Sequence, residues 1–567
     1  MLPITQALKA HPELAIFIAI VLGFLIGRIR FRGIGLGTVV GTLLAGLAVG
    51  IVAEPAIPDL LKWSFFYLFL FAIGYATGPQ FFAGLKAEAL PQIALAVVVS
   101  GTGLATALAV AWFFRFDPGI AAGIASGGLT QSAALGTALT TIAQLPLSES
   151  ARATLAAHAP IADAVTYPFG DVGVILFVVA AAPLLLKVSL RETARRYADA
   201  LEEQARHPPP LIAQRRFDYR VYRLDNPAFD ERTAGEFEAA FPGRRLYVER
   251  LRRDGRIVQV HAGTHLKVGD LLAIGSQLPA IVESAGEIGP EIADHALLAF
   301  RRQHAEVVIT NKRVAGRSIA QLSTGYGRGV FLEKVTRGQI ELPLLAHTTV
   351  QRGDVLHATG SPEAIERAAK VAGFFDTDPA RFALPFLAAG ITIGILLGLI
   401  QVVWEHTPIG LGISGSILVV GLVTGWARSS YPLFGGIPEA ATRMLQDVGL
   451  TVFIAVVGLT AGPHALQVLD ERGPEFFGTV FAAGAIVTMV PMIVGFVFGH
   501  HVLKMPTALL LGGLAGAQTA TPALNALKEA SGSNVFVLGF TVPYAINNVL
   551  LTLWGTVMVT VVHAWGR

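Results

Sequence analysis

The 567-residue chain contains no cysteine, and this absence excludes disulfide bonds and thiolate metal sites. Charge is also scarce, because 15% of the residues are charged, whereas a soluble protein has about 25%. The net charge of +3 is small and gives no indication of a nucleic-acid partner. The sequence has no P-loop, HExxH or GxSxG motif. We therefore expect neither an enzyme nor a bound cofactor or metal.

Apolar residues, in contrast, make up 53% of the chain, and the mean hydropathy is +0.58. They form two blocks, roughly residues 14–187 and 382–563, each with several runs of the ~20 residues that cross a bilayer. These blocks predict a polytopic α-helical membrane protein with a central soluble α+β insert. The expected parts are a first membrane repeat (1–187), a connector (188–216), two small domains (217–300 and 301–376) and a second membrane repeat (377–567).

Two hydroxyl-rich stretches occupy corresponding places in the two apolar blocks. Residues 127–138 read GGLTQSAALGTA, and residues 516–527 read GAQTATPALNAL. A shift of 389 positions lays Thr519 on Thr130 and Thr521 on Ser132. Polar, glycine-punctuated interruptions at matching places in two halves indicate the binding site of a transporter built from repeats.

Glycine pairs match between the blocks as well. Single matches are weak, since glycine is common in membrane helices, but matches that keep their order favour a duplication. We interpret these residues as structural, with the glycines allowing close packing and the prolines ending helices: Gly74, Gly78, Pro79, Gly458, Gly462 and Pro463.

The arginines predict the topology of the membrane part. Arg28, Arg30 and Arg32 follow the first apolar run, and basic residues also follow the last run of the first block, from Lys187 to Arg196. Both places are expected on the cytoplasmic side. The first block contains six candidate segments, but a chain that starts outside and ends inside must cross the membrane an odd number of times. The segment around 119–143 is therefore expected to enter and return on the same side. The prediction is two inverted repeats, each of about five spans plus a re-entrant or broken segment, with both termini outside.

The predicted substrate-binding residues are polar side chains within these apolar runs: Thr130, Gln131, Ser132, Gln518, Thr519, Thr521, Asp171, Asn547 and Asn548. Facing helix N-termini in the two hydroxyl-rich stretches would attract a carboxylate. The alternative is that the hydroxyls join helices to one another. Asp171 is expected to bind a substrate ammonium, a proton or Na⁺, or else to cap a helix. Asp163 closely follows Pro160 and is expected near the membrane edge.

The central stretch contains two similar modules. Each has three predicted strands, a Gly-Asp turn before the last strand (Gly269-Asp270 and Gly353-Asp354) and a final helix (Leu278–Ala285 and Pro362–Ala372).

Four stretches, residues 24–41, 69–82, 123–137 and 164–176, resemble motifs of the aspartate–alanine exchanger family of bacterial transporters. The two central modules resemble TrkA-C (RCK C-terminal) domains, which that family carries in its cytoplasmic loop. The resemblance implies a homodimer in the bacterial inner membrane that exchanges aspartate, alanine or dicarboxylates by alternating access, with one helix bundle moving against another as in an elevator. A small nucleotide or ion is a possible TrkA-C ligand. The alternative is a K⁺ or Na⁺ channel or transporter gated by the TrkA-C domains, which predicts a repeated filter.

Overall fold

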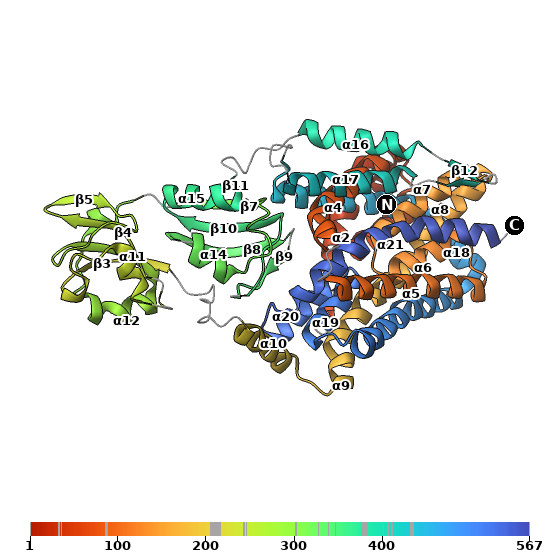
Figure 1. The fold of residues 1–567 in the computed structure, drawn as a ribbon. Helices are drawn as coiled ribbons and strands as arrows, with labels where there is room; N and C mark the ends of the chain where they lie inside the picture. The colour runs from red at the N-terminus through yellow and green to blue at the C-terminus, as the bar shows by residue number, and fades with distance from the viewer. Residues whose placement is uncertain are drawn as a thin grey trace. The chain divides into compact units, whose positions relative to one another are not determined.

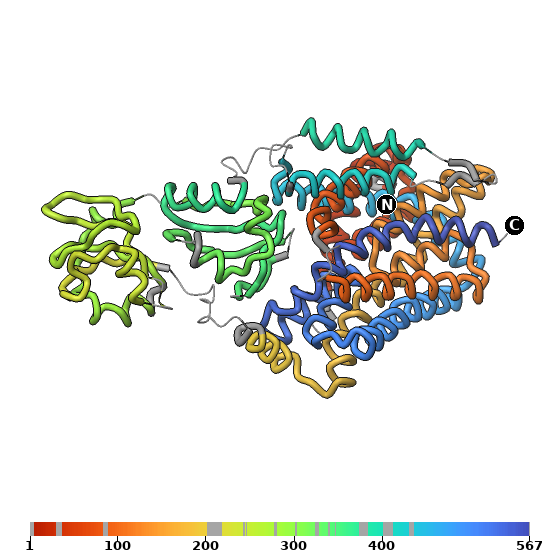
Figure 2. The backbone as a smooth tube through the Cα atoms, in the orientation of Figure 1, coloured from red at the N-terminus to blue at the C-terminus, as the bar shows by residue number. Residues whose placement is uncertain are grey.

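A computed structural model describes most of the chain, drawn in colour in Figure 2. The described residues are 2–31, 34–35, 37–84, 89–204, 217–241, 244, 246–300, 303–326, 328–337, 340–345, 347–375, 384–400, 402–404, 407–409, 412–430 and 436–565. The chain folds into two compact units (Figure 1). A helical unit comprises residues 1–197, 338–340 and 380–567, and a second unit comprises residues 198–337 and 341–379.

The first block of the helical unit consists of helices and one very short hairpin. The helices are α1 (Leu2–Ala10), α2 (Pro12–Gly27), α3 (Thr38–Ala53), α4 (Asp59–Gly84), α5 (Leu90–Phe114), α6 (Pro118–Gly128), α7 (Ser132–Gln144), α8 (Glu149–Leu176), the π-helical turn η2 (Phe177–Ala181), α9 (Ala182–Leu186) and α10 (Leu190–Gln204). Strands β1 (Arg30–Phe31) and β2 (Ile34–Gly35) pair between α2 and α3.

The second block has a similar order of elements, but a single interrupted helix stands where the first block has α4 and α5, and the π-helical turn comes earlier in the order. It contains α16 (Leu384–Gly398), α17 (Gly412–Ser430), α18 (Glu439–Val497), the π-helical turn η4 (Phe498–Val502), α19 (Thr507–Ala517), α20 (Thr521–Ser531) and α21 (Val537–Trp565). Strands β12 (Val402–Trp404) and β13 (Thr407–Ile409) pair between α16 and α17, as β1 and β2 do between α2 and α3. The sequence reading missed both hairpins, because strands of two or three residues carry no periodicity of their own.

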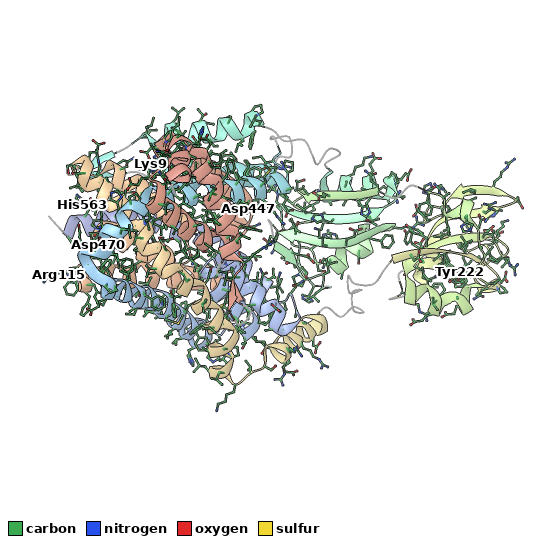
Figure 3. The ribbon with its side chains drawn as sticks, turned by 180° about the vertical axis from the view of Figure 1, so that it is seen from behind. Lys9, Arg115, Tyr222, Asp447, Asp470 and His563 are labelled. Atoms are coloured by element: carbon green, nitrogen blue, oxygen red, sulfur yellow. The ribbon has the colours of Figure 1, made fainter. Side chains whose placement is uncertain are left out.

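Among the described residues, five helical stretches are long and apolar enough to cross a bilayer: Asp59–Phe82, Leu90–Phe114, Glu149–Leu186, Glu439–Val502 and Val537–Trp565. Large apolar side chains such as Phe17 and Trp112 face outwards, with 66% and 70% of their surface exposed. Figure 3 places Arg115 and His563 together at one end of the helical unit and Asp447 towards the other. An apolar surface between charged ends is what a bilayer requires.

The prediction that Pro79 and Pro463 end helices is wrong. Pro79 lies inside α4, and Pro463 lies inside α18. A membrane helix tolerates an internal proline, because neighbouring groups can satisfy the freed carbonyl. The long helix α18 is instead interrupted at Gly473, whose φ of 71° lies in the left-handed region.

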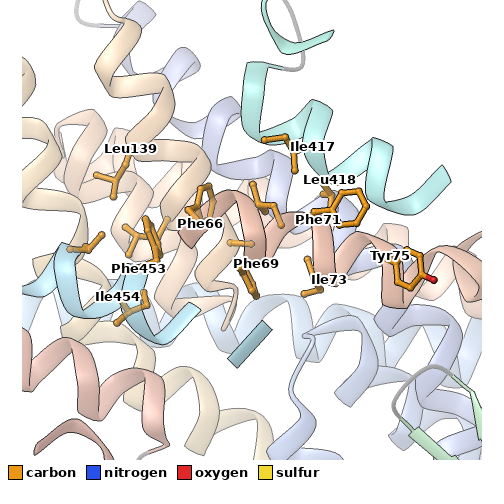
Figure 4. Close-up of a cluster of buried hydrophobic side chains, with 14 of the residues drawn as sticks. Phe66, Phe69, Phe71, Ile73, Tyr75, Leu139, Ile417, Leu418, Phe453 and Ile454 are labelled. Atoms are coloured by element: carbon orange, nitrogen blue, oxygen red, sulfur yellow. The ribbon is translucent and has the colours of Figure 1, made fainter. Parts of the chain in front are cut away.

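Glycines bring helices of the two blocks into close contact in the same way twice. A Cβ atom on Gly74 of α4 would lie 2.5 Å from the Leu418 carbonyl oxygen of α17. A Cβ atom on Gly458 of α18 would lie 2.7 Å from the Leu43 carbonyl oxygen of α3. Beside these contacts, α4, α7, α17 and α18 enclose an aromatic core in which the Phe66 and Phe453 ring centroids are 4.5 Å apart (Figure 4).

The second unit contains two modules, each an antiparallel sheet with short helices. The first has β3 (Phe217–Arg223), the 3₁₀ turn η3 (Pro227–Phe229), α11 (Ala234–Ala239), β4 (Tyr247–Arg253), β5 (Arg256–Gln259), β6 (Leu271–Gln277), α12 (Leu278–Ile288) and α13 (His295–Leu298). The second has β7 (Gln303–Ile309), α14 (Ile319–Tyr326), β8 (Val330–Arg337), β9 (Ile340–Leu342), β10 (Asp354–Gly360), α15 (Pro362–Ala372) and β11 (Gly373–Phe375).

The two sheets share one topology. Their strand orders are β3-β6-β4-β5 and β11-β7-β10-β8-β9, so the second sheet adds only an edge strand. In β3–β6, Arg223 is opposite Leu271, and in β7–β10, Val308 is opposite Val355. The sequence reading missed β3, β9 and β11.

The Gly-Asp pairs anchor a matching ion pair in each module. Gly269 and Gly353 have φ values of 96° and 88°, as a tight turn before the strand requires. Asp270 then binds the Arg253 guanidinium with contacts of 2.9 and 2.6 Å. In the second module, the guanidinium of Arg337 binds Asp354 at 2.8 Å through both nitrogens.

Candidate functional site

Helices α6 and α7 form a hairpin against α8. At the base, Asp117 Oδ2 lies 2.9 Å from His158 Nδ1 of α8. The Arg152 guanidinium, near the start of α8, donates a 3.5 Å hydrogen bond to the Ala143 carbonyl at the end of α7. The tip lies farther along α8, where a Cβ atom on Gly170 would be 2.8 Å from Thr130 Cγ2. The segment therefore turns back on itself between Gly128 and Ser132.

Helices α19 and α20 form the corresponding hairpin against α21. Gly512 and Gly516 of α19 pack on the carbonyl oxygens of Phe536 and Phe540. The Asn547 amide of α21 donates to the Ala517 carbonyl, at the tip.

The two tips have the same backbone structure. Thr130 and Thr519 have φ values of 53° and 52°, in a region that β-branched residues rarely adopt. Thr130 N–H donates to the Gly127 carbonyl, and Thr519 N–H donates to that of Gly516. The 389-residue shift relates both pairs, so the sequence match is also a match of local structure.

Side chains satisfy the carbonyls that the helix breaks set free. Thr488 Oγ1 of α18 donates to the Gly128 carbonyl at 2.7 Å, and Asn547 Nδ2 donates to the Ala517 carbonyl at 2.6 Å. The tips also contact each other, because Thr130 Oγ1 donates to the Gln518 carbonyl at 2.6 Å. The hairpins therefore meet inside the helical unit, and side chains satisfy these three carbonyls at their tips.

The structure brings most of the predicted site residues together at these tips. Gln131 Nε2 donates to Asn548 Oδ1 at 3.4 Å, which links the first tip to α21. Ser132 and Thr521 are the first residues of α7 and α20. Asp171 lies elsewhere, with its carboxylate near Gly37 at the start of α3.

Several buried polar atoms at the tips have no hydrogen-bond partner within the described part of the chain. They are Ser132 Oγ, Thr519 Oγ1, Asn547 Oδ1 and both polar atoms of the Gln518 side chain. Gln518 and Asn547 are fully buried and Ser132 is 4% exposed. Buried polar atoms normally have a partner, so a cluster without one fits the contact surface of a polar ligand.

The positive dipole ends of α7 and α20, and free N–H groups at the start of α7, add to these polar atoms. At the start of α20, Pro522 has no N–H group, and the N–H groups of Thr521 and Ala523 donate to the carbonyls of Thr519 and Ala520. Such a surface suits a small anion, and a carboxylate in particular. No group of three potential metal ligands occurs among the residues that the structure describes.

Asp163 is a carboxyl group that the sequence analysis placed wrongly. It is completely buried, not at a membrane edge, and its Oδ1 lies 2.5 Å from Ser126 Oγ of α6. The error came from reading Pro160 as close to a helix start, whereas α8 begins at Glu149 and contains Pro160 in its interior. A carboxyl group buried in an apolar segment was the available signal.

The two hairpins differ in exposure. Residues 132–139 of α7 are all buried, whereas Thr521, Pro522 and Asn525 of α20 are exposed. Helix α20 packs on α8 and η2, close to where the first block ends. The tips are thus open on the α20 side and closed on the α7 side.

Comparison with known proteins gives the class first. Residues 15–183 and 386–560 match the Asp-Al_Ex family model, described as a predicted permease membrane region, and residues 304–373 match the TrkA-C domain. The chain is therefore a multi-pass membrane transporter with a TrkA-C domain, and it belongs to the aspartate–alanine exchanger family.

Curated relatives extend over the whole chain. Uncharacterized transporters of Bordetella parapertussis and Bordetella bronchiseptica are each 51% identical over 568 residues, covering 100% of this chain and 99% of the relative. An uncharacterized transporter of Bradyrhizobium diazoefficiens is 38% identical over 556 residues, covering 97% of this chain and 98% of the relative. No solved structure matches the chain.

Proposed function

We propose that the protein is a secondary active transporter that exchanges small carboxylates or amino acids, with aspartate and alanine as the first candidates. The observation that carries the proposal is the cluster of unpartnered, buried polar atoms where the two hairpin tips meet. In this proposal the hydroxyls of Ser132 and Thr519 and the side-chain NH₂ of Gln518 donate to the substrate carboxylate, whereas Asn547 Oδ1 accepts from the ammonium of an amino-acid substrate. The starts of α7 and α20 supply positive dipole ends on either side of it.

We further propose that the two blocks are inverted repeats, each of about five spans plus a re-entrant hairpin. The matched glycine contacts and the identical tips support this layout. The basic residues after the first and last runs of the first block support a cytoplasmic soluble unit and external termini in a bacterial inner membrane. The open α20 side then faces the cytoplasm. During alternating access, α20 becomes buried and α7 becomes exposed.

Two carboxyl groups are candidates for coupling an ion or a proton to transport. Asp163 is buried between α6 and α8 behind the first tip, and Asp171 lies near the start of α3. Ionisable groups within membrane segments are rare and tend to mark such pathways.

The soluble unit is proposed to regulate transport. The first module has the strand order and the Asp–Arg pair of the second, which supports assigning it as a TrkA-C-like domain too. A small nucleotide or ion is the proposed class of effector, and a homodimer is the proposed assembly.

The test is uptake of labelled aspartate into proteoliposomes preloaded with aspartate, alanine, succinate or buffer alone. The variants are Ser132→Ala and Thr519→Ala. The control is Thr154→Ala, an exposed residue of α8 whose hydroxyl donates to the Ser150 carbonyl. A hydrogen bond to a charged group contributes about 1.5–3 kcal/mol. Each site variant should therefore weaken apparent aspartate affinity by roughly 10- to 100-fold, whereas the control should transport normally.

Three results would contradict parts of the proposal. Exchange that is unaffected in both site variants would move the substrate site away from the tips. Uptake that does not depend on internal substrate would exclude strict exchange. K⁺ or Na⁺ currents without aspartate flux would favour a cation pathway gated by the TrkA-C domains.

A further inference from the structure

The two modules of the soluble unit can be compared position by position. A turn begins at Asn226 in the first module and at Asn311, 85 residues later, in the second. In both turns the side-chain oxygen of the Asn accepts a hydrogen bond from the N–H group two residues later in the chain. The side-chain NH₂ donates to a helix carbonyl, that of Glu287 in α12 or of Val371 in α15. From the ends of β4 and β8 onwards the shift is 84 residues, because this is the separation between Asp270 and Asp354, which form the matching ion pairs. Equivalent core positions are therefore defined.

Aromatic rings fill the core of the first module. Phe229 of η3 and Phe237 of α11 have ring centroids 4.8 Å apart. Phe237 is fully buried, and Tyr222, Ile274 and Ile288 are at most 1% exposed around it. These residues belong to one continuous apolar cluster.

The second module has a smaller side chain at each of these positions. Val314 and Leu322 replace the two phenylalanines, and Val307 replaces the tyrosine. Ala358 and Ala372 replace the two isoleucines. All five line a cavity of about 100 Å³ between α14, α15 and the sheet. Val307, Ala358 and Ala372 belong to one apolar cluster and Val314 to another, and Leu356 packs against both.

We propose that this cavity binds a small organic ligand through a phenyl-sized apolar group, which occupies the space that phenylalanine rings fill in the first module. Among the lining residues that the structure describes, all are apolar except Ser323, whose hydroxyl donates to the Ala320 carbonyl. Recognition therefore depends on shape and buried apolar area, as in a known apolar cavity of roughly 150 Å³ that binds benzene.

The cavity has an opening through which a ligand can enter. Ile319 and Leu322 of α14, Leu356 of β10 and Val371 of α15 are partly exposed although they line it. Apolar surface left in contact with water is unfavourable by about 25 cal/mol per Å², so an apolar ligand that covers it gains binding free energy. This site is independent of the hairpin tips and of the identity of the transported substrate.

The experiment is hydrogen exchange measured by mass spectrometry on the full-length protein in lipid nanodiscs, with and without fluorobenzene. Peptides from α14 and α15 should exchange more slowly with the probe, by up to about 100-fold when its free concentration is 100 times the dissociation constant. The equivalent peptides of α11 and α12 in the first module provide an internal reference.

Two reciprocal variants make the test specific. Leu322→Phe copies the first module and should abolish the protection, with Val314→Phe as a second filling variant in case the first does not fold. Phe237→Leu removes a ring from the first module and should create fluorobenzene protection in α11 and α12. Protection that is absent at saturating probe, that is equal in both modules of the wild type, or that persists in both filling variants would overturn the proposal.

Discussion

Replacing Gly74 or Gly458 by alanine tests whether the close contacts between α4 and α17, and between α18 and α3, hold the helical unit together. A Cβ atom at Gly74 would lie 2.5 Å from the Leu418 carbonyl oxygen, and one at Gly458 would lie 2.7 Å from that of Leu43. The obstructing atoms are backbone, so the helices must separate to admit the methyl group.

The magnitude follows from two opposing terms. Overpacking of an interior costs about 1–3 kcal/mol. Alanine in place of glycine favours a helix by about 0.5–1 kcal/mol. Gly101 of α5 and Gly478 of α18 supply matched controls, because a Cβ atom there would meet nothing within 4 Å. The control variants gain only the helix preference of alanine. The difference in the free energy of unfolding between a contact variant and a control therefore isolates the steric cost, about 1–3 kcal/mol.

The assay is unfolding of the purified protein by sodium dodecyl sulfate in bicelles, followed by tryptophan fluorescence. Gly74→Ala and Gly458→Ala should both unfold at lower detergent fractions than the wild type, and by similar amounts because their contacts are alike. Gly101→Ala and Gly478→Ala should be as stable as the wild type or more stable. Equal stability of the contact variants and the controls would refute the argument.

Two further predictions concern buried polar groups. Thr488→Val and Asn547→Leu each remove the donor to a hairpin carbonyl and should lower the free energy of unfolding by about 1–3 kcal/mol in the same assay; unchanged stability in both would show that water satisfies these carbonyls instead. In the soluble unit, burial raises the pKa of the Glu249 carboxyl above its ordinary 4.5, although Ser361 and three guanidinium groups oppose the shift (Arg250, Arg328 and Arg367). The folded state then holds the Glu249 proton more tightly than the unfolded state, so stability should fall as the pH rises from 4.5 through the folded pKa. Glu249→Gln should flatten this pH dependence in thermal unfolding between pH 4 and 8. An unaltered slope would contradict the assignment.

Long apolar helices were predictable because a bilayer imposes their length and composition. The expected apolar block at 14–187 contains three of the long apolar stretches, among them α5, which spans Leu90–Phe114. Strands β9 and β11 were not predictable, because three residues acquire strand geometry from the neighbour that pairs with them. Helix α18 is interrupted at Gly473, whereas Pro463 was assigned a role in ending a helix that it does not have.

The hairpin tips could be located from sequence because hydroxyls recur at the same places in two apolar blocks. Thr488 could not be found this way, because a single threonine on an apolar helix has meaning only once the Gly128 carbonyl is known to lie 2.7 Å away. Asn547 was recognised as a polar interruption, but its bond to the Ala517 carbonyl depends on how α19 packs on α21. Sequence indicates which side chains are out of place in an apolar run, whereas three-dimensional packing decides their partners.

The left-handed threonines at the two tips place an energetic cost on both halves of the helical unit. A β-branched residue in this conformation costs of order 1–3 kcal/mol, and glycine would remove that cost. Both halves nevertheless have threonine at this position, with φ values of 53° and 52°. The Thr130 hydroxyl binds the Gln518 carbonyl, but the Thr519 hydroxyl has no partner among the described residues. The same strained conformation therefore occurs at both tips, and at Thr519 no hydrogen bond of the hydroxyl within the described residues offsets its cost. In the proposed transport function, a bound substrate supplies the missing contact.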